Sequence, residues 1–195
     1  MDSGDLAYLA GALLGDGYTY KGKKKGMVAV FTQKNYQWLK EIEKIIERNG
    51  GKAWIFKQRN IYVLETRFSE LINYNPIKNL QRFQGREKIE FISGFFDADG
   101  GIPKHPERLK PVTPFYYVQF VQKDKRILTV VRNLLESFGI QCGRIHKYDG
   151  KKDIWRFFVR ANSLIKFLKM INSRHPEKKN RIMIMLNRLL ERQTR

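Results

Sequence analysis

The sequence predicts an α+β fold built from two similar halves, and two observations support this prediction. Residues 9–17 read LAGALLGDG and residues 92–100 read ISGFFDADG, so an apolar run that contains glycine and ends in Asp-Gly occurs twice. A Gln-Lys pair follows each run, and Gln33 and Gln122 each precede a glycine by 17 residues. A shared register over this length indicates a duplicated unit.

Each half is predicted to run helix, hairpin, helix, hairpin, helix, because β-forming stretches alternate with segments of helical periodicity. In the first half we expect a helix over residues 6–15, hairpins over 18–32 and 52–68, and helices over 35–49 and 69–74. In the second half we expect helices over residues 86–98, 164–171 and 179–192, a helix ending at 138, a loop over 101–115, and strands over 116–121, 144–148 and 154–160. The N-terminal half then covers residues 1–77, a linker covers 78–85, and the C-terminal half covers 86–195. We expect Ser3 or Asp5 to cap the first helix.

Small residues lie four positions apart in both repeated helices. The pairs are Gly11 with Gly15, and Gly94 with Ala98. Positions i and i+4 share one face of a helix, and small residues there let two helix backbones approach closely. A glycine inside a helix costs roughly 1 kcal/mol relative to alanine, so three of them suggest a packing role. We therefore expect these four residues to form a helix–helix interface.

Each repeated helix ends on an acid, Asp16 in the first copy and Asp99 in the second. A carboxylate at the C-terminal end of a helix opposes the helix dipole, so this position is unfavourable for stability. A single Gly-Asp-Gly is most often a turn after a helix. Two matched copies instead indicate a pair of carboxylates that serve a cation.

Composition and charge point to a folded protein that binds a polyanion. The chain has 195 residues with 38 basic and 19 acidic side chains, which gives a formal charge of +19. A surplus of this size favours nucleic acid as the partner. A single cysteine, Cys142, excludes an internal disulfide and a cysteine-based zinc site. The sequence has neither a signal peptide nor an apolar run long enough to span a membrane, so we expect an intracellular protein of a prokaryotic cytoplasm or nucleoid, or of an organelle, that does not bind membranes.

With both copies in view, the sequence resembles the LAGLIDADG homing endonucleases, and the resemblance covers essentially the whole chain. Residues 94–100 match the family pattern closely, whereas the first copy lacks its earlier acid. Two copies in one chain are typical of the single-chain, monomeric members. The resemblance implies two αββαββα halves with the motif helices at their interface and two antiparallel sheets that form a saddle over double-stranded DNA. It also implies an intron-encoded, site-specific endonuclease that hydrolyses one phosphodiester in each strand with Mg²⁺ or Mn²⁺.

The resemblance assigns roles to residues in both copies. The metal site is implied at Asp16 and Asp99 together with the residues that precede them, Gly15 and Ala98. Supporting catalytic roles are implied for Gln33, Gln122, Lys34 and Lys123. Asp97 has Leu14 as its counterpart in the first copy, so we interpret Asp97 as a packing or capping residue rather than a catalytic one.

Base reading is expected from the strands, because a two-stranded ribbon fits the major groove and alternate side chains share one face. In each strand we take the set of alternate positions that carries basic side chains to face outward. The expected DNA contacts are Tyr18, Tyr20, Lys57, Arg59, Glu65, Arg67, Gln119, Arg144, His146, Arg156 and Arg160, with Lys23, Lys24 and Lys25 placed at phosphates. We assign Trp38, Trp54, Phe56, Phe95, Phe96 and Trp155 to the core, and Lys178 and Lys179 to a solvated basic helix face.

Two other classes of protein remain compatible with parts of the sequence. A non-cleaving nucleic-acid-binding protein of the same fold, either an RNA maturase or a transcription regulator, would share the charge and the repeats. Retention of Asp16 and Asp99 favours the nuclease over that alternative. An unrelated basic structural protein, such as a ribosome-associated factor, would explain the charge but not the paired Asp-Gly helices.

Overall fold

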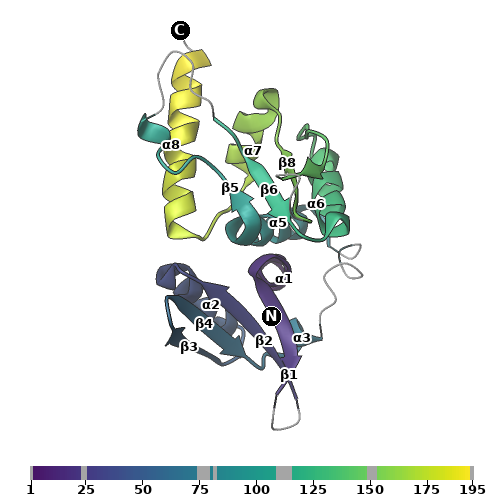
Figure 1. The fold of residues 1–195 in the computed structure, drawn as a ribbon, viewed down its shortest axis with the longest axis vertical. Helices are drawn as coiled ribbons and strands as arrows, with labels where there is room; N and C mark the ends of the chain where they lie inside the picture. The colour runs from purple at the N-terminus through teal and green to yellow at the C-terminus, as the bar shows by residue number, and fades with distance from the viewer. Residues whose placement is uncertain are drawn as a thin grey trace. The chain divides into compact units, whose positions relative to one another are not determined.

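The computed structural model describes residues 2–22, 26–73, 80, 83–108, 116–148 and 153–193. The chain divides into two compact units (Figure 1). Unit 1 comprises Met1–Ala98 and Arg174–Pro176, and unit 2 comprises Asp99–Ser173 and Glu177–Arg195. Each unit contains one four-stranded antiparallel sheet with helices, so the predicted α+β class is confirmed. No helix among the described residues has both the length and the apolar character that crossing a membrane requires.

Unit 1 begins with a helix and two hairpins. Its elements are α1 (Ser3–Asp16), β1 (Gly17–Lys21), β2 (Met27–Gln33), α2 (Tyr36–Arg48), β3 (Ala53–Gln58), β4 (Ile61–Thr66), α3 (Ser69–Ile72) and α5 (Gly85–Asp99), of which the last residue belongs to unit 2. The strand order is β1-β2-β4-β3. Asp2, rather than Ser3 or Asp5, caps α1, because its carboxylate accepts from the backbone N–H groups of Gly4 and Asp5.

The core of unit 1 lies between one face of this sheet and the helices α1 and α2 (Figure 1). Trp38 and Ile42 of α2 and Leu9 of α1 are buried with Phe31 and Leu64 of the sheet. The apolar positions of α2 recur at helical spacing, which explains why a single face of this helix is buried. Strand residues that share the phase of Phe31 and Leu64 therefore point toward the helices.

The opposite face of the first sheet carries aromatic side chains. Val30 and Val63 form part of a small cluster there, and their cross-strand partners are Tyr18 and Phe56. Trp54 is 55% exposed and Phe56 is 44% exposed, so their assignment to the core was wrong. Successive side chains of a strand point to opposite faces, so Trp54 and Phe56, the neighbours of core-facing Ile55 on β3, lie on the open side of the sheet.

Unit 2 repeats the same plan. Its elements are β5 (Gly100–Gly101), the 3₁₀ helix η2 (Pro106–Arg108), β6 (Gln119–Gln122), α6 (Lys125–Ser137), β7 (His146–Lys147), β8 (Trp155–Phe158), the 3₁₀ helix η3 (Ala161–Ser163), α7 (Leu164–Met170) and, apart from Pro176, α8 (Pro176–Gln193). The strand order β5-β6-β8-β7 corresponds strand for strand to that of unit 1. Phe120 stacks on Phe157 with 5.1 Å between ring centroids, and Phe167 of α7 meets Phe120 edge-on, so this face of the sheet is the core face.

The helices α1 and α5 touch through their backbones. A Cβ atom at Gly11 would lie 2.0 Å from the carbonyl oxygen of Phe91, and one at Gly94 would lie 2.0 Å from that of Tyr8. Only glycine fits at both positions, which is the close approach expected from the small residues. Because α5 packs on α1 in this way, α5 up to Ala98 belongs to compact unit 1, although it is the helix of the second copy of the repeat.

Candidate functional site

The first candidate acid lies at the junction between a helix and a strand. Asp16 is the last residue of α1, and the next residue, Gly17, begins β1. Gln33 ends β2 and donates a hydrogen bond from Nε2 to Asp16 Oδ2 over 2.8 Å. Gln33 Oε1 accepts from the backbone N–H of Lys34 at 2.8 Å. The glutamine amide is thereby fixed at both ends, and its nitrogen faces the carboxylate.

The second copy has the same arrangement. Asp99 ends α5, Gly100 begins β5, and Gln122 ends β6. Gln122 Nε2 donates to Asp99 Oδ2 over 2.6 Å, and Gln122 Oε1 accepts from the backbone N–H of Lys123 at 2.7 Å. The structure therefore brings each predicted acid together with its predicted glutamine, once in each unit.

This pairing orients a carboxylate without neutralising it. An amide donor to one carboxylate oxygen restricts the rotation of the side chain and brings no opposite charge. Neither α1 nor α5 has a basic residue in its last turn. Asp16 and Asp99 are both half-buried. Each unit thus presents an oriented acid at a helix end where the helix dipole favours a cation.

The lysines near the two acids make different kinds of contact. Lys34 and Lys123 are exposed, and their backbone N–H groups orient the glutamines. In unit 2 Lys178 donates from Nζ to the carbonyl oxygen of Gly100 over 2.7 Å, next to Asp99 in the sequence. Lys178 was expected on a solvated face, and this contact shows that the expectation was wrong. No sequence pattern signals this contact, because 78 residues separate the two partners.

The donor set fits a hard divalent cation. Carboxylate and backbone carbonyl oxygens are the ligands that Mg²⁺ prefers, and Mg²⁺ usually retains several waters and binds through one or two carboxylates. The part of the chain that the structure describes contains no cluster of three or more His, Cys, Asp or Glu side chains suited to a metal. A cation of this kind held by one carboxylate would complete its coordination with water and substrate oxygens.

The open face of the second sheet gathers several of the predicted DNA contacts. Arg156 on β8 pairs with His146 on β7, and Gln119 on β6 shares this face by alternation with buried Phe120. Arg156 Cζ lies 4.5 Å from the ring centre of Tyr148, and Arg156 Nε donates to His146 Nε2 over 3.0 Å. His146 accepts this bond at Nε2. These contacts hold Arg156 in one orientation on the open face.

On the first sheet the predicted phase is right for β4 and wrong for β3. Glu65 shares the open face with Tyr20, whose hydroxyl donates to Glu65 Oε1 over 3.2 Å. Lys57 has the phase of Ile55, which packs against the core, so it does not share the open face of β3. On β3 the lysine therefore lies at a position that alternates with the open face. The positions on the open face carry Trp54 and Phe56.

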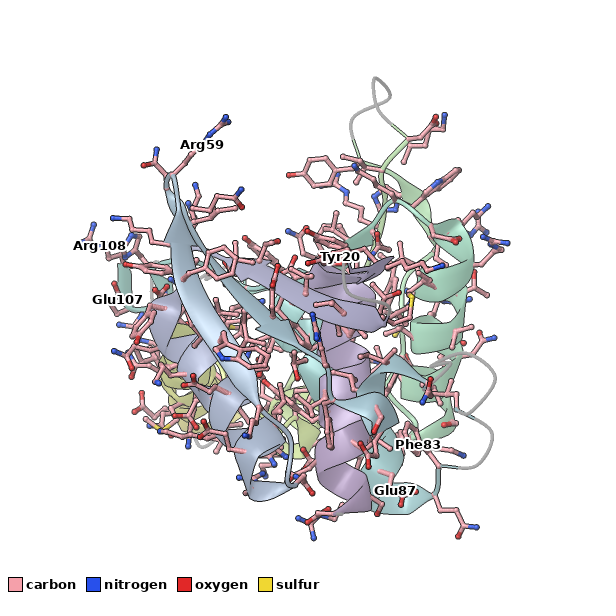
Figure 2. The ribbon with its side chains drawn as sticks, turned by 90° about the horizontal axis from the view of Figure 1, so that it is seen from below. Tyr20, Arg59, Phe83, Glu87, Glu107 and Arg108 are labelled. Atoms are coloured by element: carbon pink, nitrogen blue, oxygen red, sulfur yellow. The ribbon has the colours of Figure 1, made fainter. Side chains whose placement is uncertain are left out.

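The remaining predicted contacts lie at strand ends and turns. Arg67 follows β4 in the phase of Glu65, and Arg59, with φ 54°, projects from the tip of the β3–β4 hairpin (Figure 2). Arg160 donates from Nε to the carbonyl oxygen of Cys142 at 3.4 Å, and Arg144 is exposed. Lys23, Lys24 and Lys25 lie outside the described residues.

Comparison with known proteins identifies the class to which this fold and these paired sites belong. The model of the LAGLIDADG-like domain matches residues 3–85 and again residues 86–172. The chain therefore belongs to the LAGLIDADG family and carries two copies of the domain, which confirms the resemblance.

The similar relatives include a named enzyme. The homing endonuclease I-DmoI of Desulfurococcus mucosus is 30% identical over 186 residues, which cover 89% of this chain and 90% of the relative. The structure of I-DmoI in complex with DNA and Mn has a TM-score of 0.69 at 27% identity, covering 87% of this chain and 96% of that chain. The structure of a glycine-to-serine variant of I-DmoI with its target DNA in the presence of Mg also has a TM-score of 0.69 at 27% identity, with coverage of 87% and 96%.

Proposed function

We propose that this protein is a homing endonuclease that recognises a long asymmetric DNA site and hydrolyses one phosphodiester in each strand with a divalent cation. The observation that carries the proposal is the Asp–Gln pair that ends a motif helix in both units. Two oriented carboxylates at these positions favour cleavage over binding of DNA or RNA alone. The similarity to a homing endonuclease over nine-tenths of the chain supports the same conclusion.

In this proposal each acid serves one strand. The carboxylates of Asp16 and Asp99 would each hold a divalent cation, and the carbonyl groups of Gly15 and Ala98 would supply further hard oxygen atoms. Bound Mg²⁺ or Mn²⁺ relieves the negative charge that develops on the attacking and leaving oxygens of the phosphate. Gln33 and Gln122 keep the carboxylates oriented through the bonds described above. A positioned ligand of this kind spares the reorganisation that the reaction would otherwise require.

The side chains of the two exposed lysines contribute charge, whereas their backbone N–H groups orient the glutamines. Lys34 and Lys123 follow the two glutamines directly and extend from exposed positions. A lysine ammonium is a flexible point charge, so it suits a phosphate near the site of cleavage. Lys178 is engaged by the Gly100 carbonyl, and we assign it to the support of the second site.

Recognition of the target is assigned to the open faces of the two sheets. Arg156 is the strongest candidate for base reading, because a guanidinium fixed in one plane matches the two acceptors of guanine. Trp54 and Phe56 extend the interface of the first sheet and offer apolar contact to bases or sugars. The charge of +19 supplies the sequence-independent attraction to phosphates.

A selection followed by cleavage tests the proposal. Duplexes with a long random centre are first selected for binding in Ca²⁺, then cloned into plasmids and treated with protein and Mg²⁺. We expect linear plasmid cut at one site, no cutting with EDTA, and single-strand nicks from Asp16→Asn and from Asp99→Asn on opposite strands. Tight binding without cutting by the wild-type protein would overturn the proposal and favour a maturase or a regulator.

A further inference from the structure

A three-residue segment far along the chain belongs to unit 1. Arg174–Pro176 lies between α7 and the rest of α8, whose other residues are part of unit 2. The Arg174 guanidinium donates to Asp5 Oδ1 at 3.0 Å and to Glu90 Oε2 at 2.8 Å, and its Cζ lies 4.3 Å from the ring centre of Tyr8. These contacts attach the segment to both motif helices, because Asp5 and Tyr8 are on α1 and Glu90 is on α5.

The same segment engages Asp97, a fully buried carboxylate. Asp97 Oδ2 accepts from the Tyr8 hydroxyl at 2.6 Å, from the backbone N–H of Arg174 at 2.6 Å and from that of His175 at 3.1 Å. The Tyr8 hydroxyl in turn accepts from Trp38 Nε1 at 2.9 Å. One carboxylate oxygen therefore joins α1, α5 and the segment before α8 at a single point.

The junction lies close to the acid of one copy of the motif and far from the acid of the other. Asp97 precedes Asp99 by two residues on α5, whereas the equivalent position in the first copy is Leu14, which has no carboxylate. Tyr8 lies eight residues, more than two helical turns, before Asp16. A substitution in the junction would therefore change the conformation of the last turn of α5 directly, and that of the end of α1 only over more than two helical turns.

We propose that Asp97 is a positioning residue for Asp99: through Tyr8 and the backbone of Arg174 and His175 it fixes the last turn of α5, and so the orientation of the second acid. This inference rests on the proposed nuclease function and adds to it an asymmetry between the two strands. The first acid depends on its glutamine and on the α1–β1 junction, and the second depends in addition on a buried hydrogen-bonded junction. Displacement of a reacting group by a fraction of an ångström to about 1 Å lowers a rate steeply, so the effect is measurable as strand selectivity.

The test uses the full chain and a duplex of its selected target with a different fluorophore on each strand. Asp16→Asn and Asp99→Asn first assign each strand to an acid. Asp97→Leu, which installs the residue type of the first copy, is expected to slow cleavage of the Asp99 strand by about tenfold or more relative to the other strand. Tyr8→Phe removes one donor to Asp97 and is expected to change the ratio of the two rates in the same direction by about threefold.

The control is Thr66→Val, because Thr66 is also fully buried and its hydroxyl also makes two hydrogen bonds, to Lys52 and Phe68. This variant should lower stability without altering the ratio of the two strand rates. Affinity for the target in Ca²⁺ and the melting temperature are measured for every variant. If Asp97→Leu does not fold, Tyr8→Phe decides the question.

Equal slowing of both strands, or an unchanged ratio in folded variants, overturns the positioning role and leaves the nuclease function intact. A wild-type protein that cuts neither strand refutes the nuclease function and the positioning role together. A strand-selective effect in Asp97→Leu or Tyr8→Phe that is absent from Thr66→Val supports the positioning role, since general loss of stability affects both strands.

Discussion

Gln33 donates its amide proton to Asp16 while its own carbonyl oxygen accepts from the backbone of Lys34, so the glutamine orients the acid and is itself oriented. The bond of 2.8 Å to the carboxylate has a charged acceptor, and bonds of this kind are stronger than those between neutral groups. The corresponding bond in the second unit is 2.6 Å. Each glutamine is therefore expected to affect the rate at which one strand is cleaved.

Gln33→Ala and Gln122→Ala should each slow the cleavage of one strand. Hydrogen bonds to charged groups contribute about 1.5–3 kcal/mol, which corresponds to a rate loss of roughly 10- to 150-fold if the orientation matters in the transition state. Single-turnover nicking of a target with two labelled strands measures the effect. Binding in Ca²⁺ serves as the control, and an equal loss on both strands from a single substitution would contradict the assignment of one glutamine to each acid.

Gly11→Ala should destabilise the protein. The added methyl group would meet the backbone carbonyl of Phe91, which cannot rotate away, and overpacking of this kind costs about 1–3 kcal/mol or more. That cost exceeds the gain of roughly 1 kcal/mol in helix propensity. Urea denaturation at equilibrium gives the change in the free energy of unfolding.

Gly4→Ala provides the matched control on the same helix. A Cβ atom there would meet only side-chain atoms, Asp2 Oδ1 at 3.1 Å and Glu90 Cγ at 3.5 Å. The contact with Glu90 is of ordinary length, and only the Asp2 carboxylate that caps α1 would have to give by a few tenths of an ångström, so the variant should lose much less stability than Gly11→Ala. A Gly4→Ala variant as unstable as Gly11→Ala would show that the loss comes from the helix itself and not from its contact with α5.

Asp5 should make the free energy of unfolding decrease as the pH falls into the acid range. Burial alone raises the pKa of Asp5, but hydrogen bonds from Arg48, Asn49 and Arg174 outweigh it and lower the pKa from 3.8 to about 2. Because the pKa is lower in the folded state, this stabilisation is present above about pH 4 and is lost as the pH falls toward about 2. Asp5→Asn should therefore cost up to about 2 kcal/mol at about pH 7.

The contribution of the carboxylate is measured from the free energies of unfolding of wild type and Asp5→Asn. Their difference is determined at about pH 7 and again at about pH 2. We expect a clear difference near neutral pH that shrinks markedly in acid, where the acid itself becomes protonated. A difference of the same size at both values would show that Asp5 acts through packing and not through its charge.

Arg156→Ala should weaken DNA binding more than Lys57→Ala, although both remove one positive charge. Arg156 is fixed on the open face by His146 and Tyr148, whereas Lys57 has the core phase of its strand. Loss of a bidentate base contact costs about 1–3 kcal/mol and relaxes the preference at one base pair. Fluorescence anisotropy on the target and on its single-base variants measures both effects, and equal losses from the two substitutions would place Arg156 at a phosphate.

Asp16 and Gln33 could be picked out from the sequence, because each recurs in a second copy and the interval of 17 residues from the glutamine to the next glycine is the same in both copies, but the hydrogen bond between them was not predicted. The order of helices and strands was predictable as well, since strand alternation and helical periodicity are local properties. The phase of β3 was mistaken because Lys57 has a charge that suggests exposure, whereas Trp54 has an apolar ring that suggests burial. Which face of a sheet is covered depends on the helices that pack on it, and the strand alone does not encode that.

The contacts of Arg174 were beyond prediction for a different reason. Asp5 and Glu90 lie 169 and 84 residues away from it, and no periodic pattern connects them. The interpretation of Asp97 as a packing or capping residue agrees with its contacts, yet its partner segment could not be named from the sequence. Such long-range polar contacts are visible only when the chain is folded.

Because Arg174–Pro176 belongs to unit 1, the polypeptide passes between the two units three times. Neither unit is a continuous stretch of sequence, so a single proteolytic cut between them would not release either one complete. Chimaeras that exchange one half for that of a relative, joined at the repeat boundary near residue 86, would combine a donor Asp97 with a host Tyr8. A designer of altered specificity would therefore transfer Tyr8, Asp97 and the tripeptide as a set.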